Sequence, residues 1–247
     1  MYQIDFNRPI NVHFIGIGGI SMSGLAAILL KEGFKVSGSD SKASGLTGLL
    51  ENEGARVIIG QSSNNITSGI DLVVYTAAIH PDNPEFAEAV RQGIPMLTRA
   101  QLLGEIMKNY DMPVAVAGTH GKTTTTSMLS NITLEAGLDP TISVGGILKS
   151  IGGNIRVGNS GNFITEACEY TDSFLSFFPK IGIILNIDAD HLDYFRDLAH
   201  IRSSFHAFAK LLPPDGTLII SSSVGDLKGF TEDLACNVIT FGIDEGD

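Results

Sequence analysis

The stretch VAVAGTHGKTTTTSML, residues 114–129, places an apolar run directly before a glycine loop and four consecutive threonines. Val114–Ala117 consists of small and β-branched residues, follows Pro113 and ends at Gly118, which predicts a short buried strand. A loop and then a helix should follow that strand. This order is typical of the α/β class, in which strands of a parallel sheet alternate with helices.

The loop has the composition of a phosphate-binding site. Glycines at 118 and 121 allow backbone N–H groups to converge, and the N-terminus of the following helix adds its positive dipole end. Lys122 would contact the outer phosphates of ATP, and the Thr123 hydroxyl could bind the accompanying Mg²⁺. The general pattern G-x-x-x-x-G-K-[ST] is met except at its first position, Val116, which indicates a variant loop. The alternative is a plain strand-to-helix turn with a threonine cap.

A second glycine turn lies near the start of the chain. Its surroundings predict a strand, a turn, a helix and a strand in succession: Val12–Ile15, Gly16–Gly19, Ser21–Lys31 and Phe34–Ser37. The turn has the pattern G-x-G-x-x-S, and Asp40 follows the second strand. Such a turn can hold a diphosphate, while Asp40 can accept hydrogen bonds from a ribose or a base edge. The pattern alone leaves NAD, FAD, a sugar nucleotide and simple helix packing open.

Further short apolar runs continue the first sheet. They predict strands at Ala55–Ile59, Asp71–Tyr75 and Pro95–Leu97, with a helix at Arg99–Met107 and a helix start at Asn83-Pro84. Thr76, Ala77 and Ala78 follow a predicted strand, where open α/β sheets bind their ligands. We place the domain boundary before the connector that begins at Asn109, which gives domains at residues 1–108 and 109–247.

The second domain should again alternate strands and helices. Its predicted strands after the glycine loop are Thr141–Val144, Phe163–Glu166, Ile181–Asn186, Thr217–Ser221 and Val238–Phe241. The fold class is therefore α/β, with a Rossmann-like parallel sheet followed by a P-loop-type domain.

Two polar clusters follow strands of the second domain. Glu166 ends one predicted strand and is followed by Glu169 and Asp172. His191 follows another and has acidic neighbours at Asp188, Asp190 and Asp193. Carboxylates and one imidazole near a nucleotide suit Mg²⁺ or Mn²⁺, although each cluster alone could be a solvated loop.

Composition excludes several classes of function. A net charge of −11, from 16 Lys and Arg against 27 Asp and Glu, disfavours a general nucleic-acid binder. Cys168 and Cys236 stand outside any zinc or C-x-x-C spacing, so we expect reduced thiols. No apolar run approaches the ~20 residues of a membrane helix. We expect a cytoplasmic protein without a membrane partner.

Five stretches together resemble the Mur ligases. They are HFIGIGGISMSG (13–24), GSD (38–40), AGTHGKTTTT (117–126), TEACEYTDSFL (165–175) and LNIDADHLDYF (185–195). The resemblance covers essentially the whole chain. It implies a ligase of peptidoglycan precursor synthesis that uses ATP to join L-alanine to the lactyl carboxylate of UDP-N-acetylmuramic acid through an acyl phosphate. The nearest alternative in the family is a ligase that adds a murein tripeptide to the same UDP-sugar.

The resemblance also assigns residues. It implies catalytic roles for Lys122, Glu166 and His191, with Thr123, Glu166 and His191 holding two Mg²⁺ ions for which Mn²⁺ may substitute. The implied ATP-binding residues are Gly118, Thr119, His120, Gly121, Lys122, Thr123 and Thr124. The implied UDP-sugar-binding residues are Gly16, Gly18, Gly19, Ile20, Ser21, Ser39, Asp40, Thr76, Ala77 and Ala78.

Some features depart from the family pattern. Cys168, Tyr170 and Thr171 stand where many relatives are more acidic, which leaves the roles of Glu169 and Asp172 open. Family members also carry a C-terminal domain that closes over ATP, so we expect this chain to be a fragment that is inactive alone. Two other classes stay open: a nicotinamide-dependent oxidoreductase, which would use the first turn, and a P-loop ATPase switch, which would use the second loop. The sequence leaves the oligomeric state open.

Overall fold

The computed structural model describes residues 2–243 and 246, and it divides into two compact units, Met1–Asn109 and Tyr110–Asp247. Asn109 ends the first unit because its side chain is bonded there. Its Nδ2 donates to the Ile4 carbonyl, and its Oδ1 accepts from the Phe6 N–H. The boundary that we expected after residue 108 lies one residue earlier. No helix within the described residues is long and apolar enough to cross a membrane.

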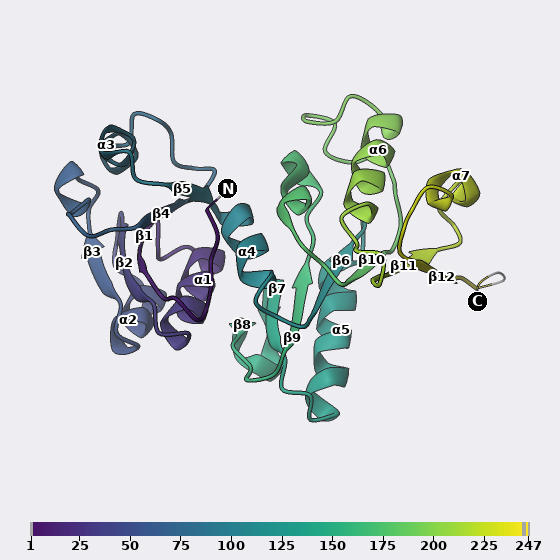
Figure 1. Ribbon diagram of the computed structural model, residues 1–247, viewed down its shortest axis with the longest axis horizontal. Helices are drawn as coiled ribbons and strands as arrows, with labels where there is room; N and C mark the ends of the chain where they lie inside the picture. The colour runs from purple at the N-terminus through teal and green to yellow at the C-terminus, as the bar shows by residue number, and fades with distance from the viewer. Residues whose placement is uncertain (1, 244–245, 247) are drawn as a thin grey trace. The chain divides into compact units, whose positions relative to one another are not determined.

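The first unit contains a five-stranded parallel sheet with strand order β3-β2-β1-β4-β5 (Figure 1). Its strands are β1 (Asn11–Ile15), β2 (Lys35–Asp40), β3 (Arg56–Ile59), β4 (Leu72–Tyr75) and β5 (Met96–Thr98). Its helices are α1 (Ile20–Lys31), α2 (Gly45–Asn52), the 3₁₀ turn η1 (Ser63–Asn65), α3 (Pro84–Gln92) and α4 (Arg99–Met107). All four predicted strands after residue 30 are present within a few residues of their expected bounds, and α2 and η1 are additional.

Local chemistry explains where these helices begin. Asn83 caps α3 by accepting from the N–H groups of Glu85 and Phe86, and Pro84 occupies the first helical position. Helices α2 and α4 begin with capping boxes at Ser44 and Thr98. The helix start predicted at Asn83-Pro84 therefore has the expected cap geometry.

The second unit contains a seven-stranded sheet with order β12-β11-β10-β6-β9-β7-β8. Its strands are β6 (Met112–Ala117), β7 (Thr141–Leu148), β8 (Gly153–Arg156), β9 (Asn162–Glu166), β10 (Ile181–Ile184), β11 (Thr217–Ser221) and β12 (Asn237–Phe241). Its helices are α5 (Lys122–Glu135), α6 (Leu198–Ala209) and α7 (Leu227–Thr231), with 3₁₀ turns η2 (Lys149–Ile151) and η3 (Tyr170–Ser176). Within this unit, α5 lies on one side of the sheet, and α6 and α7 lie on the other (Figure 1).

The sheet of the second unit is parallel except at one edge. Strand β8 pairs with β7 in antiparallel orientation, which the sequence did not lead us to expect. Fully buried aromatic side chains pack between the sheet and α6, where Phe174 contacts both Phe205 and Phe208. Strand β6 lies between β10 and β9, so the loop after β6 is flanked by the carboxyl ends of both neighbours. The candidate site therefore lies at the carboxyl ends of β6, β9 and β10.

Candidate functional site at the glycine loop of the second unit

The loop between β6 and α5 depends on its glycines. Gly118 has φ +147° and Gly121 has φ +86°, backbone conformations that residues with a Cβ rarely adopt. A Cβ at Gly118 would also lie 2.9 Å from the Leu185 Cβ. The chain can therefore turn closely over the end of β10 and enter α5 at Lys122.

The end of β10 fixes the loop through one amide side chain. Asn186 Oδ1 accepts from the His120 N–H at 2.8 Å, and its Nδ2 donates to the His120 carbonyl at 3.0 Å. The Asn186 carbonyl accepts from the Thr119 N–H at 3.2 Å. The Thr119 hydroxyl, in turn, accepts from the Asp188 N–H at 2.9 Å. Residues 119 and 120 are therefore held by the segment that follows the neighbouring strand β10.

The first turn of α5 presents unpaired donors toward the same place. Thr125 donates the first α-helical hydrogen bond, to the Gly121 carbonyl, so the N–H groups before it lack an i−4 partner within α5. No side chain caps this helix start. The side chains of Thr123 and Thr124 are exposed beside it. Backbone donors and the positive end of the helix dipole together form an anion-binding arrangement.

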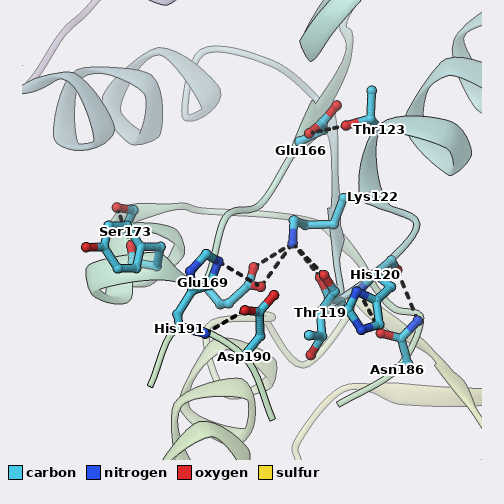
Figure 2. A network of polar contacts seen from close by, with 12 residues as sticks. Thr119, His120, Lys122, Thr123, Glu166, Glu169, Ser173, Asn186, Asp190 and His191 are labelled. Carbon is cyan, nitrogen blue, oxygen red and sulfur yellow. Dashed lines mark hydrogen bonds and ion pairs between the residues drawn. The ribbon is translucent and has the colours of Figure 1, made fainter. Parts of the chain in front are cut away.

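Lys122 is bonded to its own loop and to a buried carboxylate (Figure 2). Its Nζ donates to the Gly118 carbonyl at 2.7 Å, to the Thr119 carbonyl at 3.3 Å and to Glu169 Oε1 at 3.0 Å. The sequence left the role of Glu169 open. The order of strands explains the contact, because Glu169 follows β9 and Lys122 follows β6, and these strands are neighbours.

Thr123 and Glu166 form a second pair of polar side chains in the site. The Thr123 hydroxyl donates to Glu166 Oε2 at 3.1 Å, and the Gly145 N–H donates to Oε1 at 2.6 Å. A Cβ at Gly145 would lie 2.6 Å from Glu166 Oε2, so a residue with a side chain there would displace the carboxylate. Gly145 is therefore a residue that supports the site, and its sequence context gave no signal of this.

His191 lies on the other side of Glu169 from Lys122 (Figure 2). Its Nε2 is 4.0 Å from Glu169 Oε1, and the Tyr170 ring centroid is 4.7 Å from the imidazole centroid. His191 has φ +50°, and Asp190 accepts from its backbone N–H. No hydrogen bond or ion pair between the described residues joins His191 to Thr123 or Glu166. The structure thus gathers the three expected metal ligands around one loop but in two separate contacts.

Two tyrosine–aspartate hydrogen bonds cross between η3 and the segment around His191. The Tyr170 hydroxyl donates to Asp193 at 2.8 Å, and the Tyr194 hydroxyl donates to Asp172 at 2.7 Å. Each bond to a carboxylate raises the pKa of its tyrosine hydroxyl. Asp172 and Asp193, which belong to the two predicted polar clusters, therefore hold these two segments together.

The donor set fits Mg²⁺ better than a metal that requires a cage of protein ligands. Thr123 and Glu166 offer oxygen atoms, which hard divalent cations prefer. Across the described residues, no group of three or more His, Cys, Asp or Glu side chains is placed to hold an ion. An Mg²⁺ ion keeps several waters and takes phosphate oxygens, so two protein oxygens beside a phosphate loop are sufficient.

The glycine turn of the first unit is built differently. Gly16 has φ +86°, and the Ser39 carbonyl at the end of β2 accepts from the N–H groups of both Gly16 and Ile17. Asp40 Oδ2 accepts from the Gly18 N–H at 2.9 Å. A Cβ at Gly18 would lie 2.8 Å from that oxygen. The turn is therefore held by backbone and carboxylate acceptors at the end of the neighbouring strand.

The remaining residues expected at the UDP-sugar site fall into two groups. Gly19, Ile20 and Ser21 lie at the start of α1, and the Ile20 side chain is 56% exposed. Thr76, Ala77 and Ala78 follow β4, whose end lies beside the end of β1. A Cβ at Gly16 would lie 3.4 Å from the Thr76 Cγ2. All of these residues thus lie at the carboxyl ends of adjacent parallel strands.

Ser39 differs from the rest of this group because its side chain is fully buried. Its hydroxyl donates to Glu85 Oε2 at 2.6 Å, and Asn65 also donates to the Glu85 carboxylate. The buried His13 Nε2 lies 3.5 Å from the same Oε2. Burial raises the pKa of Glu85, but the contacts with His13, Ser39 and Asn65 outweigh it and lower the pKa overall. Ser39 therefore contacts the glycine turn through its backbone carbonyl and not through its side chain.

Comparison with known proteins agrees with this geometry. Residues 11–111 match the family model described as Mur ligase family, catalytic domain, and residues 116–247 match the model of the Mur ligase middle domain. Among curated relatives, UDP-N-acetylmuramate–L-alanine ligase of Lachnospira eligens is 63% identical over 99% of this chain and 53% of that protein. The enzyme of the same name from Clostridium perfringens is 57% identical over 99% of this chain and 54% of that protein.

Solved structures give the same result. The UDP-N-acetylmuramate:L-alanyl-gamma-D-glutamyl-meso-diaminopimelate ligase of Neisseria meningitides superposes with a TM-score of 0.85 at 30% identity, over 97% of this chain and 80% of that one. MurC of Thermotoga maritima, a UDP-N-acetylmuramate-alanine ligase, gives a TM-score of 0.78 at 29% identity, over 96% of this chain and 53% of that one. The chain spans about half the length of the curated relatives it matches. Because the middle-domain model alone matches more than half of its residues, the chain belongs to the Mur ligase family.

Proposed function

We propose that the protein containing this chain is a UDP-N-acetylmuramate:L-alanine ligase, which makes a peptidoglycan precursor with ATP. The curated relatives with this name, at 55–63% identity over 98–99% of the chain, carry the proposal. In this reaction the lactyl carboxylate attacks the γ-phosphate of ATP, and ADP leaves. The amine of L-alanine then attacks the acyl phosphate, and inorganic phosphate leaves. Because the reaction consumes ATP, we place it in the cytoplasm.

The loop of the second unit would bind the ATP phosphates. Backbone N–H groups at the start of α5 would hold phosphate oxygens, and Lys122 would stabilise the negative charge on the transferring group. Residues from Gly118 to Thr124 form this binding site. Because two anions must approach each other in line, neutralising and positioning them is the main task of the side chains.

Thr123 and Glu166 would hold one Mg²⁺, and His191 would serve a second metal site nearer the substrate carboxylate, with Mn²⁺ as a substitute. When bound, the ion would supply positive charge that offsets the charge of the phosphates. The contact from the Gly145 N–H orients Glu166 for this role, because it fixes one carboxylate oxygen and leaves the other directed to Thr123.

The turn of the first unit would bind the UDP portion of the sugar nucleotide. Its helix N-terminus offers backbone donors to the diphosphate, and Asp40 offers an acceptor to the ribose or the uracil. Thr76, Ala77 and Ala78 leave room beside the turn because they are small.

A second candidate is the ligation of a murein tripeptide to the same UDP-sugar. The observation that favours it is the TM-score of 0.85 with the Neisseria tripeptide ligase, higher than the 0.78 with the Thermotoga L-alanine ligase. The two candidates share ATP and the UDP-sugar and differ in the amine. A P-loop switch would instead dimerise in a nucleotide-dependent way and would leave the first turn without a ligand.

Calorimetry with the 247-residue chain tests the two nucleotide sites. We expect binding of ATP with Mg²⁺ and of UDP-N-acetylmuramic acid, weaker binding of UDP-N-acetylglucosamine, and no binding of NADH. Binding of NADH in place of the UDP-sugar would contradict the proposal. In the complete protein, release of ADP with L-alanine as the amine should far exceed release with the tripeptide L-alanyl-γ-D-glutamyl-meso-diaminopimelate. The reverse preference would establish the second candidate.

A further inference from the structure

Glu169 occupies a central position in the polar network around the glycine loop. It lies between Lys122, whose Nζ is 3.0 Å from Oε1 and 2.8 Å from Oε2, and His191, whose Nε2 is 4.0 Å from Oε1 (Figure 2). The Glu169 residue is 1% exposed. A carboxylate at this depth requires a positive partner, because burying an unpaired charge is costly.

Lys122 is held by three hydrogen bonds within the loop and to Glu169. An ammonium group has three N–H donors, and here Nζ donates to Gly118, Thr119 and Glu169. The lysine side chain is 16% exposed. Its ammonium group is therefore bound by protein oxygen atoms and is largely shielded from solvent.

A bound phosphate would compete for the same ammonium. Glu169 and a nucleotide phosphate are both anions, and each forms charge-assisted hydrogen bonds with a lysine. The two carbonyl contacts belong to the loop itself, whereas the Glu169 contact comes from a different strand end. Lys122 Nζ contacts both oxygens of Glu169, with a hydrogen bond to Oε1 and an ion-pair contact at 2.8 Å to Oε2. Moving Nζ toward a phosphate would therefore break both contacts with Glu169 and retain the loop around it.

We propose that Glu169 is the counter-ion of Lys122: a positioning residue whose carboxylate holds the lysine in the loop and competes for it with the phosphates of ATP. This proposal rests on the ATP site of the proposed function. The Glu169 contact adds a cost to nucleotide binding, since the phosphate must displace a carboxylate from the lysine. After displacement, His191 is the adjacent group to which Glu169 can turn.

Four chains test the proposal: the natural chain, Glu169→Gln, Lys122→Met and the double variant. ATP affinity is measured by calorimetry in EDTA, so that metal binding does not contribute. Glu169→Gln should lower the ATP dissociation constant about tenfold, because the phosphate no longer competes with a carboxylate. In the Lys122→Met background the same substitution should change the dissociation constant less than about threefold, because no lysine is left to release.

Thermal unfolding of the same four chains supplies a second readout. Glu169→Gln should lower the melting temperature of the natural chain, because it weakens the partner of a largely buried lysine. In the Lys122→Met background it should raise the melting temperature, because it removes a buried carboxylate that has lost its partner. Glu135→Gln, at the exposed far end of α5, is the matched control and should change neither quantity.

The outcomes separate this proposal from the proposed function. A natural chain that does not bind ATP would contradict both. A chain that binds ATP, but in which Glu169→Gln has the same effect with and without Lys122, would overturn the counter-ion role alone. A weaker ATP affinity in the Glu169→Gln single variant would do the same, and would give Glu169 a direct part in binding.

Discussion

The glycine loop after β6 and the glycine turn after β1 both lead from a parallel strand into the N-terminus of a helix, yet their charged groups have opposite signs. In the loop, Lys122 donates to the carbonyls of Gly118 and Thr119. In the turn, Asp40 accepts from the Gly18 N–H. Each charged side chain is bonded to the backbone of its own loop, but one offers a cation to a ligand and the other a carboxylate.

The opposite charges of Lys122 and Asp40 suit the two sites to different ligands. A phosphate group that is being transferred develops charge that a nearby cation must stabilise, and the loop supplies one in Lys122. The turn combines backbone donors with the Asp40 carboxylate as an acceptor. Such a site suits a diphosphate that is recognised together with a ribose or base. We therefore propose that the second unit carries the chemistry and the first the recognition of the UDP-sugar.

Lys122→Ala tests most directly whether the loop and the turn bind different ligands. We expect ATP affinity to fall about 100-fold, because a charge-assisted phosphate contact is lost, while UDP-sugar affinity stays within a few fold. Calorimetry of both ligands with the same variant gives the answer. An equal loss for both ligands would mean that the two units share one nucleotide site.

Glu166→Gln addresses the metal side of the same loop. We expect it to weaken Mg²⁺-dependent turnover of the complete protein about 10- to 100-fold, because one carboxylate oxygen is lost as an ion ligand. The melting temperature should change little, since Glu166 lies at a strand end. His191→Ala should behave in the same way. Unchanged turnover in either variant would remove that residue from the site, and a large fall in melting temperature would indicate a structural role.

Gly18→Ala is the corresponding change in the first unit. The new Cβ would lie 2.8 Å from Asp40 Oδ2 and 2.9 Å from Thr47 Cγ2, so the turn or the carboxylate must move. We expect UDP-sugar affinity to fall about five- to tenfold from this crowding, with ATP affinity unchanged. Gly48→Ala is a suitable control, because nothing lies within 4 Å of a Cβ there. Loss of ATP affinity in Gly18→Ala would contradict the division of roles.

An ion pair outside both loops provides the smallest expected effect. Hydrogen bonds from Arg156 and Asn159 lower the pKa of Asp139 to about 2. Because the folded-state pKa is depressed, the pair stabilises the fold above the ordinary pKa of an aspartate and loses that contribution as the pH falls toward 2. Asp139→Asn should therefore lower the melting temperature slightly at pH 7, and the difference should vanish near pH 2. A difference that is independent of pH would mean that charge is not the cause.

The sequence was most informative where local chemistry determines structure. The cap at Asn83, the helix from Arg99 to Met107 and the strand from Thr217 to Ser221 have the expected bounds. In the strand from Ile181, hydrogen-bonded pairing with β6 continues to Leu185, although the strand itself ends at Ile184. The expected residues of the glycine loop lie together because they are consecutive.

The sequence was least informative about contacts between distant segments. Asn186 holds His120, and Gly145 holds Glu166. Gly145 lies in no quoted motif, and the LNIDADHLDYF stretch that contains Asn186 did not indicate which segment Asn186 contacts. Both contacts follow from the strand order, which places β10 and β9 on either side of β6 and β7 beside β9. The antiparallel β8 and the pairing of Glu169 with Lys122 were missed for the same reason. Apolar patterns in the sequence predict strands, but they do not predict which strands lie side by side in the sheet.

Ser39 links the glycine turn of the first unit to a residue outside that turn. One end of this residue supports the glycine turn through its carbonyl, and the other is tied to Glu85 on α3. Ser39 therefore joins the glycine turn to α3 within one residue. A substitution at Glu85 would remove the acceptor of the Ser39 hydroxyl and so act on the turn without contacting its ligand.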